Sequence, residues 1–391
     1  MYKSKKNILK NKKKIVFFSG NRAELDFQKP VFKILNNFKK LKLYFVLSGT
    51  HTIKNFYSNN IYKEKYFEIN SKKISININT KSLQGTSNYF AKLVEKFNFF
   101  LKDKKIDFAF LCSDRFESFA VATSCFLNGI KIIHYEGGDV TEGGTYDDKI
   151  RNSISQIANY HLVSNKYSAI NLHKMGINKN TIYDVGLLSL NSSFKIKRKN
   201  FNKLFNSLKL DKEKKILVVT YHANPSEGHQ NFKYAKNLFE TVNYLTRHKN
   251  FQAIVTYPNQ DPGYDLVLEA LKNTKFNSNV KIIKNLGALN YHLMLNYCGN
   301  ENKGICIGNS SSGIKETETF NCPTVNIGKR QKGRIASKNV INCGNGKKQI
   351  LESVIKANNN KFRKNIKKSK KIYLKINSNK ILKEALHKII Y

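Results

Sequence analysis

The stretch KIVFFSGNRAE (residues 14–24) sets the pattern from which the fold can be predicted. Its first part, KIVFFS (14–19), is an apolar run of strand length, and GNRAE (20–24) turns from it into a helix expected near residues 26–38. The same order of strand, polar turn and helix starts again at KILVVTY (215–221). A continuous apolar run followed by a helical pattern is typical of a parallel strand that is covered on both faces.

Outward from these two stretches, short apolar runs alternate with helical patterns along most of the chain. The further strands that we expect are 43–47, 107–112, 131–134, 160–163, 181–185, 251–257, 280–283, 304–307 and 323–327. A polar stretch, 191–206, separates the two series of strands. We therefore predict an α/β protein with an N-terminal domain over 1–190, a C-terminal domain over 191–371, and a helix over 372–391 that packs back on the first domain.

The composition is that of a globular protein except for its charge. Of 391 residues, 40% are hydrophobic and 25% charged, and 69 Lys and Arg against 27 Asp and Glu give a net charge of +42. Because the lysines are spread over the chain together with many asparagines, we interpret them as solvated positions and expect no specific nucleic-acid partner. The basic runs 3–14 and 361–371 could still attract RNA or an anionic membrane surface weakly.

Cysteine spacing and hydropathy exclude several other classes of protein. The six cysteines form no CxxC pair, which argues against a zinc ribbon or a disulfide scaffold. No apolar run approaches the roughly 18 residues of a membrane span, and the basic N-terminus leads straight into a strand rather than a signal peptide. We therefore expect a cytoplasmic protein with reduced thiols and, because most histidines lack a ligand pattern, no metal site.

Polar and ionisable residues follow the predicted strands again and again. In an open parallel sheet, ligands bind beyond the carboxyl ends of the strands, so these positions are candidate site residues. They are Arg22, Glu24, His51, Asp114, Arg115, His134, Glu136 and Asp139 in the first half, and His222, Asn259, Asn309, Ser310 and Ser311 in the second. The first set is rich in acids and the second in groups that suit a phosphate.

The run IGNSSSGIKE (307–316) is the sharpest local signal. Small residues between a strand and a helix expose backbone N–H groups at a helix N-terminus, which suits a diphosphate. We expect Glu316 in the first helical turn, where its carboxylate could accept hydrogen bonds from ribose hydroxyl groups. The competing interpretation is a capped helix start with small residues. The chain has neither a GxxxxGK[ST] nor a GxGxxG motif, so we expect no dinucleotide cofactor.

The acidic candidates are Asp114, Glu136 and the adjacent pair Asp147 and Asp148. Carboxylates at neighbouring strand ends can divide acid and base work when their environments push their pKa values apart. The alternative is that they cap helices or form salt bridges with nearby arginines. For Asp148 we favour a helix cap.

Six strings in order resemble the UDP-N-acetylglucosamine 2-epimerase family: GNRAE (20–24), SDRFE (113–117), HYEGGD (134–139), DDKIR (147–151), GNSSSGIKE (308–316) and GKRQKGR (328–334). The segment VTEG (140–143) is similar to the hydrolysing branch, which releases a free 2-epimerised amino sugar for sialic-acid-type pathways. The resemblance implies two Rossmann-like domains facing across a cleft, as in GT-B glycosyltransferases. It also implies a UDP-sugar substrate and no cofactor, and we expect a homo-oligomer, either a dimer or a tetramer.

The same resemblance implies roles for individual residues. The diphosphate would be bound by Arg22, His222, Ser310 and Ser311, the ribose by Glu316, and the nucleotide side by Asn259 and Arg330. Asp114 and Glu136 would be the main acid and base, with Asp147 close by and Arg115 and Arg151 in support. Three departures from the family pattern concern this site. Ala223 replaces a proline after His222, Asp139 stands where glutamate is more usual, and residues 144–146 lengthen the approach to Asp147.

Several other functions remain open at this point. Within the enzyme class they are a hydrolysing 2-epimerase of a diacetamido sugar nucleotide, a non-hydrolysing 2-epimerase and a GT-B glycosyltransferase. From a different class, the net charge of +42 is compatible with an RNA- or membrane-binding protein on a degenerate epimerase scaffold.

Overall fold

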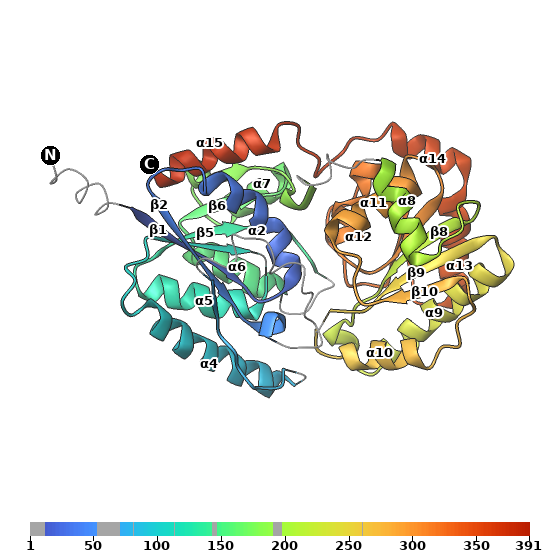
Figure 1. Cartoon of the computed structure of the whole chain (residues 1–391), viewed down its shortest axis with the longest axis horizontal. Helices are drawn as coiled ribbons and strands as arrows, with labels where there is room; N and C mark the ends of the chain where they lie inside the picture. The colour runs from blue at the N-terminus through green and yellow to red at the C-terminus, as the bar shows by residue number, and fades with distance from the viewer. Residues whose placement is uncertain are drawn as a thin grey trace. The chain divides into compact units, whose positions relative to one another are not determined.

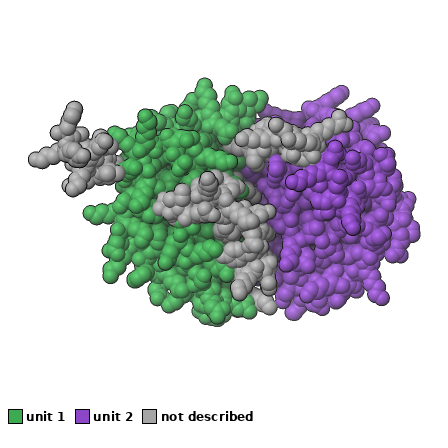
Figure 2. Space-filling model, in the orientation of Figure 1, with its two compact units in different colours: residues 1–139, 146–188, 375–391 green, residues 140–145, 189–374 purple. Residues whose placement is uncertain are grey.

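The computed structural model describes residues 12–52, 71–80, 82–112, 114–142, 147–190, 198–259 and 261–391. The chain divides into two compact units, coloured separately in Figure 2: unit 1 is residues 1–139, 146–188 and 375–391, and unit 2 is residues 140–145 and 189–374. The basic run 3–14 lies almost entirely outside the described residues, as does the Arg22 side chain. The predicted domain borders at 190/191 and 371/372 differ from the unit borders by two and three residues. We did not expect residues 140–145 to be assigned to unit 2.

Within the described residues, unit 1 is built on a parallel sheet of seven strands in the order β3-β2-β1-β4-β5-β6-β7. The strands are β1 (Lys13–Ser19), β2 (Leu41–Leu47), β3 (Ser71–Lys73), β4 (Phe108–Cys112), β5 (Lys131–Tyr135), β6 (Tyr160–Val163) and β7 (Ile182–Asp184). The helices are α2 (Arg22–Leu35), α4 (Leu83–Leu101), α5 (Phe116–Leu127), α6 (Asp147–Ile157), α7 (Lys166–Lys174) and α15 (Ser378–Ile390).

Alternate residues of β1 explain why residues 15–18 in its centre are all apolar. Ile15 and Phe17 face the cluster that includes residues of α2 and α15, whereas Val16 and Phe18 face the cluster with α4 and α5. Burying each such side chain contributes roughly 1.5–3 kcal/mol relative to leaving it exposed. The C-terminal helix α15 completes the first cluster with Leu382, Leu386 and Ile390, and Figure 1 shows it, in red, among the blue and green elements of unit 1.

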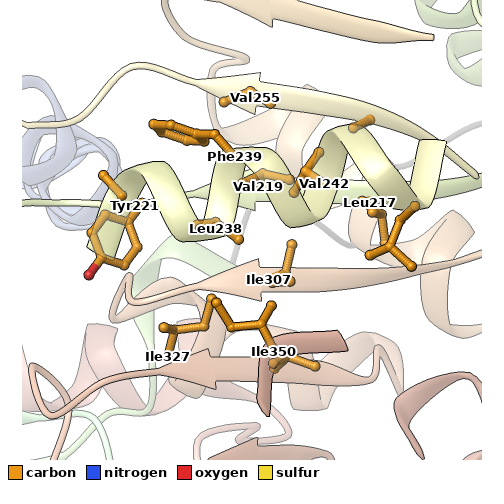
Figure 3. Packing of buried hydrophobic residues seen from close by; sticks show 14 of the residues in the cluster. Leu217, Val219, Tyr221, Leu238, Phe239, Val242, Val255, Ile307, Ile327 and Ile350 are labelled. Carbon is orange, nitrogen blue, oxygen red and sulfur yellow. The ribbon is translucent and has the colours of Figure 1, made fainter. Parts of the chain in front are cut away.

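Unit 2 repeats the plan with a parallel sheet that has six strands among the described residues, in the order β10-β9-β8-β11-β12-β13. The strands are β8 (Lys215–Thr220), β9 (Phe251–Thr256), β10 (Val280–Ile283), β11 (Gly304–Gly308), β12 (Thr324–Ile327) and β13 (Val340–Cys343). The helices are α8 (Arg198–Leu208), α9 (Gln230–His248), α10 (Tyr264–Lys272), α11 (Ala288–Gly299), α12 (Ser312–Lys315), α13 (Lys347–Asn358) and α14 (Asn360–Lys367). Figure 3 shows Leu238, Phe239 and Val242 of α9 packed with strand residues such as Val219 and Ile307.

The α/β fold with two parallel sheets and helices is confirmed, and the differences from the prediction are local. Helix α2 begins at Arg22 rather than near residue 26, because Asn21 caps it and forms a capping box with Glu24. Helix α8 overlaps the stretch 191–206, which we interpreted only as a polar separator. Its buried Phe201, Leu204 and Phe205 give it the helical spacing that the surrounding polar residues conceal.

Candidate active site

Two carboxylates follow neighbouring strands of unit 1, and a buried arginine holds one of them. Asp114 follows β4 and Glu136 follows β5, strands whose last residues pair in register. The Arg151 side chain, from α6, is 1% exposed, forms ion pairs with Asp114 and Asp148, and donates from Nη1 to the Asp139 carbonyl at 2.9 Å. Burial alone would lower the pKa of Arg151, but the surrounding carboxylates outweigh it and raise that pKa well above its ordinary value.

Glu136 has a backbone conformation that glycine would adopt more easily. Its φ is +73°, in the left-handed region, where a residue with a side chain is less stable by roughly 1–2 kcal/mol. The Glu136 N–H donates to the Leu162 carbonyl at 3.0 Å, which links the turn after β5 to β6. Strained residues of this kind gather at functional sites, and Glu136 is 93% buried.

The other charged candidates of unit 1 are arranged differently from the prediction. Asp148 lies in the first turn of α6 and pairs with Arg151 three residues later, so the favoured role as a helix cap is wrong and the salt-bridge alternative is correct. Asp147 lies in the same turn. Arg115 forms an ion pair with Glu117 at 3.1 Å.

A second polar cluster lies where β1 and β2 end. The Ser19 hydroxyl contacts His51 Nε2 at 2.9 Å and donates to Glu24 Oε2 at 3.1 Å, while the Gly20 N–H donates to the same Glu24 oxygen at 2.7 Å. Burial raises the pKa of Glu24 to about 7. His51 is 1% exposed, so the structure places it inside this cluster rather than at a surface. Sequence reasoning missed Ser19, although the capping-box spacing identifies its partner Glu24.

His134 is also buried, and its environment is shared with another histidine. Its Nδ1 lies 3.1 Å from the Ser155 hydroxyl of α6, and in the sheet it pairs with His161 of β6. Burial, and the neighbouring His134, lower the pKa of His161 to about 3. His161 is therefore a buried, uncharged group at physiological pH.

In unit 2, His222 is oriented by hydrogen bonds with its surroundings. Its backbone N–H donates to Asn309 Oδ1 at 2.7 Å, and Asn309 Nδ2 donates back to the His222 carbonyl at 2.8 Å. The Asn259 backbone N–H donates to His222 Nδ1 at 3.0 Å, so the ring proton is carried by Nε2. Burial and the nearby Arg330 lower the pKa of His222 to about 3. The ring is therefore a neutral donor through Nε2 at physiological pH.

Arg330 lies beside His222 and Asn309. One of its terminal nitrogens donates to the Asn309 carbonyl at 3.2 Å and the other forms an ion pair with Asp261, also at 3.2 Å. Gln331 donates to the same Asn309 carbonyl at 3.0 Å. Of the predicted nucleotide-side residues, the structure brings His222, Asn309 and Arg330 together, and Asn259 joins them through its backbone.

The glycine and serine run after β11 borders a small pocket. The pocket is lined by Thr220, Cys306, Ile307, Gly308, Ser310, Gly313, Thr324 and Asn326. Gly308 has a φ of +140°, and a Cβ added there would lie 1.8 Å from the Thr220 carbonyl oxygen, so only glycine fits. Ser310 contacts the Ser312 hydroxyl at 2.9 Å, and Ser311 is the N-cap residue of α12.

Glu316 is not where the sequence predicted it. Helix α12 has only four residues, and Glu316 is its C-cap rather than part of a first turn, because a 3₁₀ helix, Thr317–Phe320, follows at once. Glu316 Oε2 lies 2.7 Å from His292 Nε2, and Glu316 Oε1 accepts from the Ser189 hydroxyl at 3.1 Å. We missed His292 because it is 24 residues away in the sequence and follows no strand.

Three further observations concern the described part of the chain as a whole. It contains no cluster of three or more His, Cys, Asp or Glu side chains arranged to bind a metal ion. None of its helices combines the length and the apolar character needed to cross a membrane. All six cysteines are free thiols.

Comparison with known proteins gives a consistent result. The sequence profile of the family described as UDP-N-acetylglucosamine 2-epimerase matches residues 33–387. The chain is 32% identical over 336 residues to the GDP/UDP-N,N'-diacetylbacillosamine 2-epimerase (hydrolyzing) of Campylobacter jejuni, covering 85% of this chain and 84% of that protein. It is 30% identical to the UDP-N,N'-diacetylbacillosamine 2-epimerase (hydrolyzing) of Legionella pneumophila, with 84% of each chain covered.

Solved structures agree on the fold. The crystal structure of UDP-GlcNAc 2-epimerase from Neisseria meningitidis bound to UDP-GlcNAc superposes with a TM-score of 0.78 at 17% identity, covering 96% of this chain and all of that one. The family profile covers most of the chain, and two relatives at 30% identity or more are hydrolysing enzymes by name. This chain therefore belongs to the UDP-N-acetylglucosamine 2-epimerase family, in its hydrolysing branch.

Proposed function

We propose that this protein is a hydrolysing 2-epimerase of a UDP-linked 2-acetamido sugar, which it converts with water to UDP and the free 2-epimer. The observation that carries the proposal is the pair Asp114 and Glu136 after adjacent strands, with Asp114 paired to the buried Arg151. A carboxylate next to a fixed guanidinium stays ionised and can accept a proton. Glu136, after the adjacent strand, supplies a second carboxylate.

In this proposal, unit 2 binds the nucleotide. The neutral His222 ring donates from Nε2 to the diphosphate, while Ser310, Ser311 and the Arg330 guanidinium provide further donors. Preorganised donors of this kind stabilise negative charge as it develops on the leaving UDP, and removing one such donor typically costs about 10²–10³-fold in rate. Glu316 accepts hydrogen bonds from the ribose. Arg22, whose side chain is outside the described residues, would add a positive charge to the diphosphate.

Unit 1 carries out the proton chemistry in this proposal. The hydrogen on carbon 2 of the sugar is weakly acidic, and coupling its removal to the departure of UDP from carbon 1 avoids a free carbanion. One carboxylate accepts that proton, the C1–O bond breaks with its electron pair leaving on UDP, and a glycal forms. Water then adds its oxygen to carbon 1, and carbon 2 receives a proton on the opposite face. Each positioned acid or base contributes about 10²–10⁴-fold.

The relatives guide the choice of sugar. The two that are at least 30% identical are named for N,N'-diacetylbacillosamine nucleotides, whereas the UDP-N-acetylglucosamine 2-epimerase of Neisseria meningitidis is 26% identical over 351 residues. We therefore propose UDP-N,N'-diacetylbacillosamine as the first candidate substrate and UDP-N-acetylglucosamine as the second. Both have an acetamido group on carbon 2, so the same elimination applies to either.

Product analysis by NMR tests the proposal. The protein is incubated with each nucleotide sugar separately, with the Asp114→Asn variant as the matched control. We expect UDP and a free sugar epimerised at carbon 2 from at least one substrate and a greatly reduced yield from the variant. Release of an epimerised sugar still linked to UDP would indicate a non-hydrolysing epimerase, and UDP release only when an acceptor is added would indicate a glycosyltransferase. Either result contradicts the proposal.

A further inference from the structure

We propose that His292 and Ser189 are positioning residues that hold the Glu316 carboxylate for the ribose, and that they make the site selective for ribonucleotides over 2'-deoxyribonucleotides. This inference rests on the proposed function, because it assumes that Glu316 accepts hydrogen bonds from the ribose. It narrows the class of substrate to ribonucleotide sugars, since nucleotide sugars occur with both ribonucleosides and 2'-deoxyribonucleosides.

Each oxygen of the Glu316 carboxylate has its own protein partner. His292 Nε2 contacts Oε2 at 2.7 Å, and the Ser189 hydroxyl donates to Oε1 at 3.1 Å. Because a carboxylate has no proton to donate, His292 Nε2 carries the proton in the shorter contact. Two donors at different oxygens fix the rotation of the carboxylate plane, which one donor alone would leave free.

His292 can orient the Glu316 carboxylate because its own side chain is held in place by packing. It lies on α11, is fully buried, and its ring centroid is 5.4 Å from that of Phe320. The three residues that follow it on α11, Leu293–Leu295, are buried as well, which anchors the helix in unit 2. The Glu316 side chain is 12% exposed, so it lies at the border between this packed region and solvent.

The hydrogen-bonding capacity of the carboxylate identifies the ligand. Each carboxylate oxygen can accept more than one hydrogen bond, so Oε1 and Oε2 can each accept another in addition to the protein donor. Two adjacent oxygens held in one plane match the two neighbouring hydroxyl groups of a ribose, at its 2' and 3' positions. A 2'-deoxyribose lacks one of these donors and would leave one oxygen of a partly desolvated carboxylate without it. A hydrogen bond to a charged group corresponds to roughly a 10–100-fold difference in affinity.

Calorimetric titration of UDP and of 2'-deoxy-UDP tests the inference. The wild-type protein should prefer UDP by about 10–100-fold. His292→Leu should reduce this preference to within about threefold by weakening UDP binding while leaving 2'-deoxy-UDP binding nearly unchanged. His292→Gln, whose side-chain amide can donate to Glu316, should restore much of the preference, and Ser189→Ala should lower it partly. Asn296→Ala, one turn further along α11, is the matched control and should behave as wild type.

The outcomes separate this inference from the proposed function. A wild-type protein that binds neither nucleotide contradicts the proposed function and the inference with it. A protein that binds UDP, but for which folded His292→Leu keeps the full preference, contradicts the inference alone. Should His292→Leu fail to fold, as judged by circular dichroism, His292→Gln with Ser189→Ala and Glu316→Gln give the same comparison. Glu316→Gln must then lose the preference, and an unchanged preference in that variant overturns the inference.

Discussion

The candidate residues of unit 1 and unit 2 hold their functional groups in opposite ways. In unit 1, charge organises the site: a buried guanidinium, Arg151, pairs with Asp114 and Asp148, and Glu136 has a strained backbone. In unit 2, hydrogen bonds between uncharged groups orient His222, which contacts the Asn309 side chain and the Asn259 backbone. The first arrangement suits proton transfer, which needs groups that change charge. The second suits a diphosphate, which needs donors that stay in place.

Removing one carboxylate of unit 1 should have the largest effect. Asp114→Asn should lower kcat by about 10²–10⁴-fold, because the amide cannot accept the proton that the carboxylate would accept. UDP affinity should change little, since none of the UDP-binding residues of unit 2 is altered. Steady-state kinetics together with calorimetric titration of UDP measure the two effects. A variant that loses UDP binding as strongly as activity would contradict the division of work between the units.

The second-largest effect should be a loss of stability when the buried cation, Arg151, is removed. Arg151→Met leaves the carboxylates of Asp114, Asp139 and Asp148 close together without their shared partner, and breaking a buried ion pair costs about 3–5 kcal/mol. Because the two ion-paired aspartates are each about a quarter exposed, we expect the lower end of this range. Urea denaturation followed by circular dichroism measures the change in the free energy of unfolding. Arg330→Met breaks the ion pair with Asp261 in unit 2, and because the Arg330 side chain is 16% exposed this change should cost less. Equal costs would contradict the comparison.

A moderate effect is expected when the oriented histidine of unit 2 is removed. His222→Leu should weaken UDP binding by about 10-fold or more, because a donor to a charged phosphate is lost. Since the pKa of His222 is lowered to about 3, protonation of this ring makes no contribution to the pH dependence of UDP binding between pH 5 and 8. Titrations at pH 5.5, 6.5 and 7.5 with wild type and variant test this. If the difference in UDP affinity between wild type and His222→Leu changes with pH across this range, the ring titrates near its ordinary pKa and the prediction is wrong.

The last prediction concerns acid stability. His161 has a folded-state pKa of about 3 against an ordinary value of 6.5, so the unfolded chain binds its proton first. The free energy of unfolding should therefore fall as the pH drops from 6.5 toward 3, and His161→Leu should make this fall shallower. Urea denaturation at pH 7 and pH 5 measures the difference. Equal falls in the two proteins would mean that His161 titrates normally.

The fold was predictable wherever the strands are buried on both faces. Runs such as 15–18 and 216–219 are apolar throughout because neither face of those strands is open to water. Of the four edge strands in the described part of the chain, β3 and β13 were missed. Ser71–Lys73 is exposed and Val340–Cys343 is only partly buried, so neither forms a run of buried apolar residues. Helix α8 was hidden by the polar residues between its buried positions.

The site was predictable residue by residue but not contact by contact. The strand-end rule identified Asp114, Glu136 and His222 because the carboxyl ends of parallel strands meet at one edge of a sheet. The spacing of Asp148 and Arg151 is that of helix neighbours, yet the pairing of Arg151 with Asp114 joins residues 37 apart and depends on the packing of α6. The contact between His292 and Glu316 depends in the same way on how α11 packs in unit 2.

Turnover in heavy water tests the central claim most directly, namely that the carboxylates of unit 1 move a proton at carbon 2 while unit 2 holds the departing UDP. The free sugar formed in heavy water is analysed by NMR for deuterium at carbon 2. The account predicts complete labelling at that carbon in the product of the wild-type protein. A 2-epimerised product that retains its original hydrogen at carbon 2 would contradict it.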